Sequence, residues 1–244
     1  MGKGRLEAWT TLGTAAAMLA LAGCAHNSPY EPADPLEKIN RPIYAFNMVA
    51  DQYVLRPVAV TYVNYAPPPL RIGVSNFFDN LFYPAVIIND ALQAKFKQSG
   101  LDLTRFVLNT TFGLAGLLDP ATMVGLEKHD EDFGQTLGHW GVGEGWYIVL
   151  PLFGPSTNRD VVGRVGDIWT SPLQYVNLDL QDRLEFAAVQ AVDTRTKLLD
   201  FDSILKQQLD PYVFLRTAYL QRRLNQVYDG NPPDELMEPA LPDD

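Results

Sequence analysis

Two neighbouring segments, residues 76–92 and 101–118, are mostly apolar but carry polar side chains at intervals, and this pattern constrains the fold of the chain most strongly. As a single helix, the first segment would be about 25 Å long, less than the roughly 30 Å hydrocarbon core of a bilayer. Pro84, near its middle, shortens any straight piece further. The segment is therefore predicted to lie in, or dip into, one leaflet rather than to span a membrane.

The second segment has a polar stripe. Asp102, Arg105 and Asn109 are three and four residues apart, so a helix places them on one face. Such groups would be costly if they faced lipid. They can face water on an ordinary soluble bundle, which the pattern alone favours. They can also turn inward around a water-filled path in a membrane-seated protein, which a lipid anchor would favour.

The N-terminal segment predicts export and lipid attachment. Two basic residues precede an apolar stretch over 15–22 that is too short to span a membrane, and Cys24, the only cysteine, follows it closely. This arrangement is similar to a bacterial lipobox, in which the cysteine thiol takes a diacylglycerol. Residues 1–23 are therefore predicted to be a signal peptide and Cys24 to carry acyl chains. Each buried methylene would contribute about 0.8 kcal/mol to membrane binding. Ala25, rather than Asp, after the cysteine favours the outer membrane.

The mature chain divides into three parts. Residues 24–35 are rich in proline and predict an extended linker, and residues 36–228 form a mainly α-helical domain. Residues 229–244 are acidic and proline-rich, with no Lys or Arg, and predict a disordered tail.

Within the helical domain, proline and glycine mark the expected interruptions. Pro42 is expected to break or kink the first helix, and a pause is expected at Pro67–Pro69. Residues 125–166 contain nine glycines and predict loops, with a short extended piece at Tyr147–Phe153. Helices are expected to resume near Asp182, and a further helix is expected from Pro211 to about Tyr228.

Several classes of function are excluded or disfavoured. A formal net charge of −10 argues against a nucleic-acid-binding protein, whose footprint would be basic. No nucleotide-binding loop or catalytic set is recognised, so neither an enzyme nor a cofactor is predicted. A polar cluster matches none of the common zinc or calcium spacings and predicts a solvated acidic loop rather than a metal site. Its members are His129, Asp130, Glu131, Asp132 and His139.

Many separated motifs together resemble one family. The first are Asp34-Pro-Leu-Glu37, Asn40-Arg41, Phe46-Asn47 and Leu55-Arg-Pro-Val58. The middle ones are Gly73-Val-Ser-Asn-Phe-Phe78, Asn80-Leu81, Arg105-Phe106 and Asn109-Thr-Thr-Phe-Gly113. The last are Glu131-Asp-Phe-Gly-Gln-Thr-Leu-Gly138, Trp140-Gly-Val142, Leu150-Pro-Leu-Phe-Gly-Pro-Ser-Thr157 and Arg159-Asp160. Over about residues 34–220 the chain resembles the MlaA (VacJ) lipoproteins of Gram-negative outer membranes.

The resemblance implies a mainly α, ring-like helical bundle, partly embedded in the inner leaflet of the outer membrane, with an amphipathic central channel. It implies association with a trimeric porin. It also implies removal of phospholipids that have strayed into the outer leaflet, and their transfer to a soluble periplasmic carrier. ATP is absent from the periplasm, so the transport must be powered elsewhere.

Within this picture, residues divide into three hypothetical roles. The channel lining is assigned to Asn76, Asp79, Asn80, Arg105 and Asn109, with Arg105 able to meet a phosphate. Acyl-chain contacts are assigned to Phe77, Phe78, Leu81, Phe82 and Ile87. Phe46 and Asn47 are assigned to holding the resting shape of the channel. Replacing Arg105 by Glu is then expected to impair lipid clearance at an unchanged protein level.

Two alternatives stay open. One is a structural lipoprotein that stabilises porins or the envelope without moving lipid. The other, less favoured, is a phospholipase-like enzyme that acts on the same misplaced lipids. The amount of phospholipid in the outer leaflet distinguishes the first from a transporter, and the release of fatty acid or lysophospholipid would identify the second.

Overall fold

A computed structural model describes residues 34–236 of the chain. The predicted signal peptide, the lipidated Cys24 and the linker up to residue 33 lie outside the described residues, as do residues 237–244 of the predicted tail. The described part of that tail, residues 229–236, contains a short 3-10 helix, η3 (Asp234–Leu236).

The domain is mainly helical, with a single two-stranded sheet in the described part. Its helices are α2 (Glu37–Ala50), α3 (Arg56–Tyr65), α4 (Pro68–Leu92), α5 (Phe96–Thr111), α6 (Pro120–Met123), α7 (Phe133–His139), α8 (Asn158–Thr170), α9 (Leu180–Lys197), α10 (Phe201–Lys206) and α11 (Pro211–Val227). A π-helical segment, η1 (Asp51–Leu55), and a 3-10 turn, η2 (Pro172–Gln174), complete the set. The two strands are β1 (Tyr147–Leu150) and β2 (Gly154–Thr157).

The first helical rod continues through Pro42, where a break or kink was expected. Pro42 lies inside α2, and η1 joins α2 to α3 without leaving helical dihedral angles at either junction. A proline in a helix removes one backbone hydrogen bond and crowds the preceding turn. Here the contacts of α2 with the β-hairpin hold the helix on both sides of that position. The predicted break was therefore wrong because tertiary contacts offset the local cost.

The pause at Pro67–Pro69 is confirmed. Ala66 and Pro67 are extended, and Pro68 and Pro69 occupy the first turn of α4, where a missing N–H costs nothing. Helix α4 then runs unbroken through Pro84 for 25 residues, so it begins earlier than predicted from the apolar segment. Among residues 34–236, no helix is long and apolar enough to cross a membrane.

The glycine-rich region holds more regular structure than predicted. Helices α7 and α8 begin at side-chain caps, with Asp132 accepting from the N–H of Gln135 and Thr157 from the N–H of Asp160. Between them, β1 and β2 form an antiparallel hairpin that pairs Tyr147 with Thr157. The sequence indicated only the extended piece, because short helices rich in glycine carry little periodic signal.

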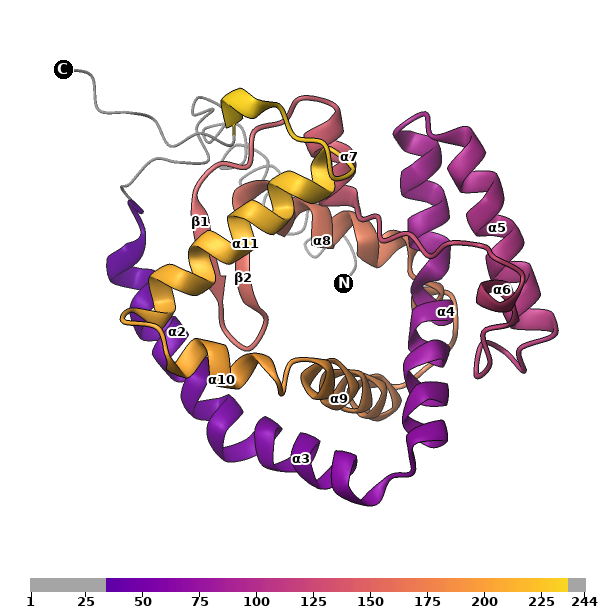
Figure 1. Ribbon diagram of the computed structural model, residues 1–244, viewed down its shortest axis with the longest axis horizontal. Coiled ribbons are helices and arrows are strands. Elements are labelled where there is room, and N and C mark those ends of the chain that lie inside the picture. The colour runs from indigo at the N-terminus through magenta and orange to yellow at the C-terminus, as the bar shows by residue number, and fades with distance from the viewer. Residues whose placement is uncertain (1–33, 237–244) are drawn as a thin grey trace, which may run out of the picture.

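The helices and the β-hairpin are arranged in a ring. Figure 1 shows α2 and α3 along one side, α4 with α5 on another, and α8, the hairpin and α11 closing the circuit, with α9 and α10 lying inside α3 and α2. A small apolar core joins the hairpin to α11 and α2, and its buried members are Tyr147, Val149 and Tyr212. The ring-like, mainly helical fold predicted from the resemblance is confirmed.

Close packing of α7 on α8 depends on glycine. A Cβ at Gly163 would lie 2.5 Å from the backbone nitrogen of Gly134, which is too close for any side chain. By contrast, a Cβ at Gly100, inside α5, would meet nothing within 4 Å.

We therefore expect Gly163→Ala and Gly100→Ala to change stability in opposite directions. Gly163→Ala should cost about 1–3 kcal/mol of unfolding free energy, because the two helices must separate. Gly100→Ala should stabilise α5 by about 0.5–1 kcal/mol, because Ala loses less backbone entropy than Gly. Thermal unfolding in detergent measures both variants, and an unchanged melting temperature for Gly163→Ala would contradict the packing described.

Candidate functional site

The distribution of polar and apolar side chains is reversed relative to a water-soluble protein. Among residues 34–236, 18 polar or charged residues are buried, compared with nine apolar ones. Large apolar side chains lie instead at the surface, with Phe96 72% exposed, Phe112 69% and Trp169 70%. Isolated exposed apolar residues are normal, but exposed apolar surface on this scale marks a site of contact with lipid or with another protein.

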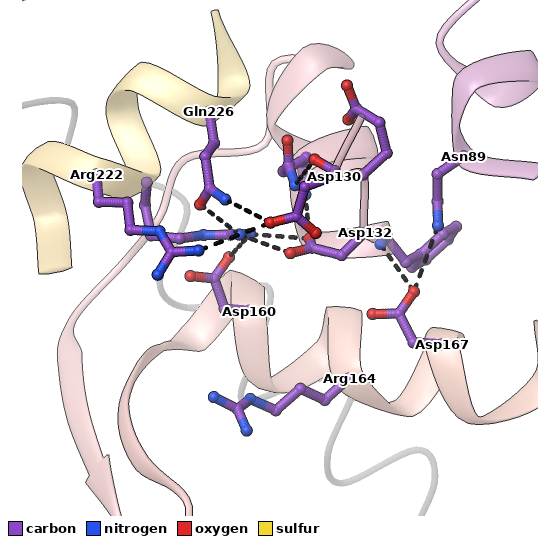
Figure 2. A network of polar contacts seen from close by, with 12 residues as sticks. Asn89, Asp130, Asp132, Asp160, Arg164, Asp167, Arg222 and Gln226 are labelled. Carbon is purple, nitrogen blue, oxygen red and sulfur yellow. Dashed lines mark hydrogen bonds and ion pairs between the residues drawn. The ribbon is translucent and has the colours of Figure 1, made fainter. Parts of the chain in front are cut away.

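An ion-pair network joins three neighbouring elements of the ring. The Arg223 guanidinium of α11 donates to Asp132 at 2.6 Å, at the start of α7, and to Asp160 of α8 at 2.8 Å. Figure 2 shows the carboxylates of Asp132 and Asp160 converging with Gln226 of α11. Burial alone would raise the pKa of Asp132, but the bonds and charge of Arg223 lower it, so the carboxylate stays ionised.

A second network connects α4 to α7 and α8. Asn89 of α4, which is fully buried, accepts from the Thr136 hydroxyl at 2.8 Å and lies 3.4 Å from an oxygen of Asp167. The same Asp167 oxygen accepts from the backbone N–H of Phe133 at 2.9 Å, and Figure 2 shows Asn89 and Asp167 facing one another. Polar contacts thus fix α4 against the glycine-rich part of the ring.

The acidic loop is less solvated than predicted. Glu131 is buried and bonded to Gln93 at 2.8 Å and to Lys95 at 2.9 Å. Asp132 is paired with Arg223, whereas Asp130 is exposed. The prediction of a solvated loop was therefore wrong for Glu131 and Asp132, because sequence spacing does not reveal the cations supplied by distant helices. No group of three or more metal-ligating side chains is present in the described part of the chain.

Three predicted lining residues lie between helices instead of facing open space. Arg105 is 3% exposed, donates to the carbonyl of Leu126 at 2.6 Å and also donates to Asp119. Asn109 bonds Asp119 at 3.0 Å, and Asn80 bonds the Thr110 hydroxyl at 3.0 Å. These side chains hold α4, α5 and α6 together.

This placement corrects the expectation for Arg105. Its guanidinium is already neutralised by Asp119 and is not free to meet a phosphate. Reversing its charge would leave two carboxylate groups facing each other in a buried site, which is strongly destabilising. We therefore expect Arg105→Glu to lower the protein level, so that variant does not test lipid clearance alone.

The other two predicted lining residues are more open. Asp79 is paired with Lys128 at 2.5 Å and lies 3.9 Å from Lys197 of α9, and all three side chains are partly exposed. Asn76, one turn earlier on α4, lies 3.4 Å from the carbonyl of Leu117. The structure therefore separates Asn76 and Asp79 from the buried Asn80, Arg105 and Asn109.

The residues assigned to acyl-chain contact lie on α4 with different degrees of burial. Phe78 is buried and makes an edge-to-face contact with Phe77 and a stacked contact with Phe82. Phe77, Leu81, Phe82 and Ile87 are partly exposed. Phe78 thus packs within the protein, and the other four retain surface for lipid.

The pair assigned to channel shape lies beside the β-hairpin. The Asn47 amide donates to the carbonyl of Leu150 at 2.9 Å and accepts from the N–H of Leu152 at 2.7 Å. Asn40, two turns earlier, bonds the β1 backbone in the same way at Tyr147 and Val149. Two side-chain amides thus take the place of a third strand along β1. The neighbouring Phe46 side chain is 54% exposed. No role was predicted for Asn40, and its seven-residue spacing from Asn47, two helical turns, is the signal that places both amides on one face of α2.

The comparisons with known proteins agree on one family. A family model described as MlaA lipoprotein matches residues 32–226. The chain belongs to the MlaA family. A relative from Escherichia coli, named intermembrane phospholipid transport system lipoprotein MlaA, is 41% identical over 83% of this chain and 82% of its own length. A relative of the same name from Haemophilus influenzae is 38% identical over 93% of this chain and 92% of its own.

A solved structure also matches the fold. It is described as concerning the structural basis for maintenance of bacterial outer membrane lipid asymmetry. It aligns with a TM-score of 0.72 at 39% identity and covers 82% of this chain and all of its own.

A buried carboxyl on α4 predicts an unusual pH dependence of stability. Asp90 is fully buried, its Oδ1 accepts from Gln98 at 2.7 Å and its Oδ2 has no hydrogen-bond partner. Burial, reinforced by the neighbouring Asp102 carboxyl, raises the pKa of Asp90 to about 8. Between pH 4 and pH 8 the native state therefore keeps a proton that the unfolded chain releases, and the free energy of unfolding falls as pH rises.

Asp90→Asn is expected to remove this slope, because an amide has no proton to lose in that range. The measurement is chemical unfolding in detergent at pH 5, 6.5 and 8, with the exposed Asp200→Asn as the matched control. The free energy of unfolding of Asp90→Asn, relative to that of the wild type, should increase with pH. A constant difference at all three values would mean that Asp90 is ionised in the native protein.

The contact of Asn47 with the hairpin turn predicts a local change in hydrogen exchange. In Asn47→Ala the N–H of Leu152 loses its acceptor, and its exchange should become about fivefold faster, as expected for the loss of one hydrogen bond. Asn64→Ala, at an exposed position on α3, is the control. Unchanged exchange at Leu152 in Asn47→Ala would show that the turn is held by other contacts.

Proposed function

We propose that this protein is an outer-membrane lipoprotein that removes mislocalised phospholipids from the outer leaflet and passes them to a periplasmic carrier, so maintaining lipid asymmetry. The proposal rests first on its family, because relatives from two organisms are named as lipoproteins of an intermembrane phospholipid transport system. It rests next on the matched solved structure, described as concerning outer-membrane lipid asymmetry.

The observation that carries the proposal is the reversed distribution of polarity. A phospholipid needs polar groups around its headgroup and hydrocarbon around its tails. The exposed apolar side chains offer a surface for acyl chains, and the partly exposed Asp79, Lys128 and Lys197 offer polar groups to a headgroup. We infer that the apolar outer surface is seated in the inner leaflet, with Cys24 as the lipid anchor and the polar side in contact with the periplasm.

The residue roles follow from accessibility. Asp79 and Asn76 remain the proposed lining residues, because their polar groups are not buried between helices. Asn80, Arg105 and Asn109 are proposed to position the helices that form the path. Phe77, Leu81, Phe82 and Ile87 are proposed to contact acyl chains, with Phe78 packing behind them. Asn47, with Phe46 beside it, is proposed to hold the shape of the path through its bonds to the hairpin turn.

The proposed partners are a trimeric porin and a soluble periplasmic carrier. The porin would provide a protein neighbour in the membrane for part of the exposed apolar surface. The carrier would receive lipid on the periplasmic side, where energy must come from an inner-membrane machine. We propose no cofactor and no enzymatic step, in line with the transport role named for the relatives.

The decisive experiment measures outer-leaflet phospholipid in cells with and without the gene. We expect the deletion strain to accumulate phospholipid in the outer leaflet, and plasmid-borne wild-type protein to restore the normal level. Porin level and lysophospholipid are measured in the same cells. Normal asymmetry with altered porin would favour the structural lipoprotein instead. Release of lysophospholipid that depends on the protein would favour the enzyme.

A further inference from the structure

Three charged side chains meet where α4, α9 and the segment between α6 and α7 come together. Asp79 lies in the middle of α4, and each of its two carboxylate oxygens faces a different lysine. Lys128, from the segment that joins α6 to α7, lies 2.5 Å from Oδ2. Lys197, in the last turn of α9, lies 3.9 Å from Oδ1. Figure 1 shows that segment crossing α4, and α9 lying inside α3. Three separate elements thus bring two cations and one anion to one place.

These charges are open to solvent and can exchange partners. The side chains of Asp79, Lys128 and Lys197 are 35%, 46% and 49% exposed. Ion pairs at this degree of exposure contribute little to stability, so their partners separate readily when other charges approach. The pair of Arg105 with Asp119 differs, because the Arg105 side chain is only 4% exposed and is held between helices.

A second carboxylate keeps Lys197 in place. Its Nζ lies 3.1 Å from Asp193, one turn earlier on α9, whose side chain is 5% exposed. Because the Asp193 carboxylate is buried, it orients the ammonium without offering its own charge to a ligand. The accessible part of this cluster is therefore two ammonium groups and the single carboxylate of Asp79.

Apolar surface adjoins the cluster on both helices. Phe82 follows Asp79 by three residues on α4, so the two side chains are neighbours on one helix face, and Phe82 is partly exposed. Leu198, next to Lys197, is 49% exposed. Charged groups with an accessible apolar neighbour on each helix match the junction between the headgroup and the acyl chains of a lipid.

The signs of the charges favour a zwitterionic headgroup over an anionic one. A phosphodiester that binds the lysines draws them away from Asp79, and a headgroup without a cation would leave that carboxylate unpaired beside the phosphate. A primary ammonium on the headgroup instead donates to Asp79, while the phosphate accepts from Lys128 and Lys197. Every charge of the lipid and of the cluster then has a partner of opposite sign.

We propose that Asp79, Lys128 and Lys197 form a binding site selective for a zwitterionic glycerophospholipid headgroup with a primary ammonium. The ammonium binds Asp79, the phosphate binds the two lysines, and the acyl chains lie along Phe82 and Leu198. This site rests on the proposed function, since it names the headgroup class that the function engages.

The test is a competition between lipids that differ only in their headgroups. Full-length protein in a neutral detergent is mixed with equal amounts of palmitoyl-oleoyl phosphatidylethanolamine, phosphatidylcholine and phosphatidylglycerol. Native mass spectrometry then identifies the bound lipid by its mass. Because the tails are identical, their contribution to partitioning between micelle and protein cancels. Glycerophosphoethanolamine, which has the headgroup without the tails, is added as a separate competitor.

The variants are Asp79→Asn, Lys128→Gln and Lys197→Gln. The matched controls are Asp200→Asn and Lys206→Gln, which change the same residue types at exposed positions away from the cluster. Circular dichroism establishes that each variant is folded, which the exposure of the three side chains leads us to expect.

The wild type should bind phosphatidylethanolamine about three- to tenfold better than phosphatidylglycerol, as expected for a charge-assisted bond that is partly open to water. Phosphatidylcholine should lie between them, because its quaternary ammonium carries the charge but no N–H donor. Asp79→Asn should abolish the preference, since an amide does not attract an ammonium. Lys128→Gln and Lys197→Gln should increase it, because Asp79 then repels an anionic headgroup with one lysine fewer beside it. Both controls should match the wild type.

Equal binding of phosphatidylethanolamine and phosphatidylglycerol by the wild type would overturn the site and leave the proposed function standing, since lipid is still bound. A preference that persists in Asp79→Asn would place the ammonium elsewhere, with the same consequence. Should Asp79→Asn fail to fold, the lysine variants decide, and an unchanged preference in both rejects the site.

Displacement of the lipid by glycerophosphoethanolamine at equal concentration would make the site one for a soluble zwitterion, against the proposal. Absence of bound lipid in the wild type, together with normal asymmetry in the deletion strain, would overturn the proposed function as well.

Discussion

The Arg223 guanidinium, held between Asp132 and Asp160, is the interaction on which closure of the ring depends. It connects the last long helix to Asp132 and Asp160, which lie 91 and 63 positions earlier in the chain. Removing one partner from a buried pair of this kind typically costs about 3–5 kcal/mol, because a charge is left without compensation. The networks at Asn89 and Glu131 act in the same way at other junctions, as does the Arg195 guanidinium of α9, which donates to Asp51 and Asp202. Polar contacts therefore do in this protein much of what apolar packing does in a soluble domain.

This arrangement has a direct physical reason. A protein whose outer surface meets hydrocarbon gains little from turning its apolar side chains inward, because lipid is as apolar as the interior would be. Buried polar groups, by contrast, have no water to compete for them and must be paired with each other. The Asp51 carboxylate, which accepts two bonds from Arg195 beside the π-helical turn, illustrates how charge fixes a helix junction. Asn40 and Asn47 satisfy in the same way the backbone groups along the edge of β1 that no other strand pairs.

The structure separates polar groups that are paired inside the protein from those that remain partly open to solvent. Arg105, Asn80 and Asn109 were reasonable candidates for a lining because their spacing places them on helix faces, but the structure pairs each of them internally. Asn76 and Asp79, by contrast, stay partly exposed. Pairing cannot be read from one helix at a time, since the partners of Arg105 lie 14 to 21 residues further along the chain.

The sequence by itself determined the helical class, the corner at Pro67–Pro69, the start of α11 at Pro211 and the family, because local periodicity, proline geometry and motif identity are properties of short segments. It also predicted correctly that Asp102, Arg105 and Asn109 share a face. Only the tertiary structure decided that this face turns toward neighbouring helices, that α2 and α4 continue through Pro42 and Pro84, and that Glu131 is buried beside Lys95. These outcomes depend on contacts between distant segments, whose energies exceed the local preferences of the residues involved.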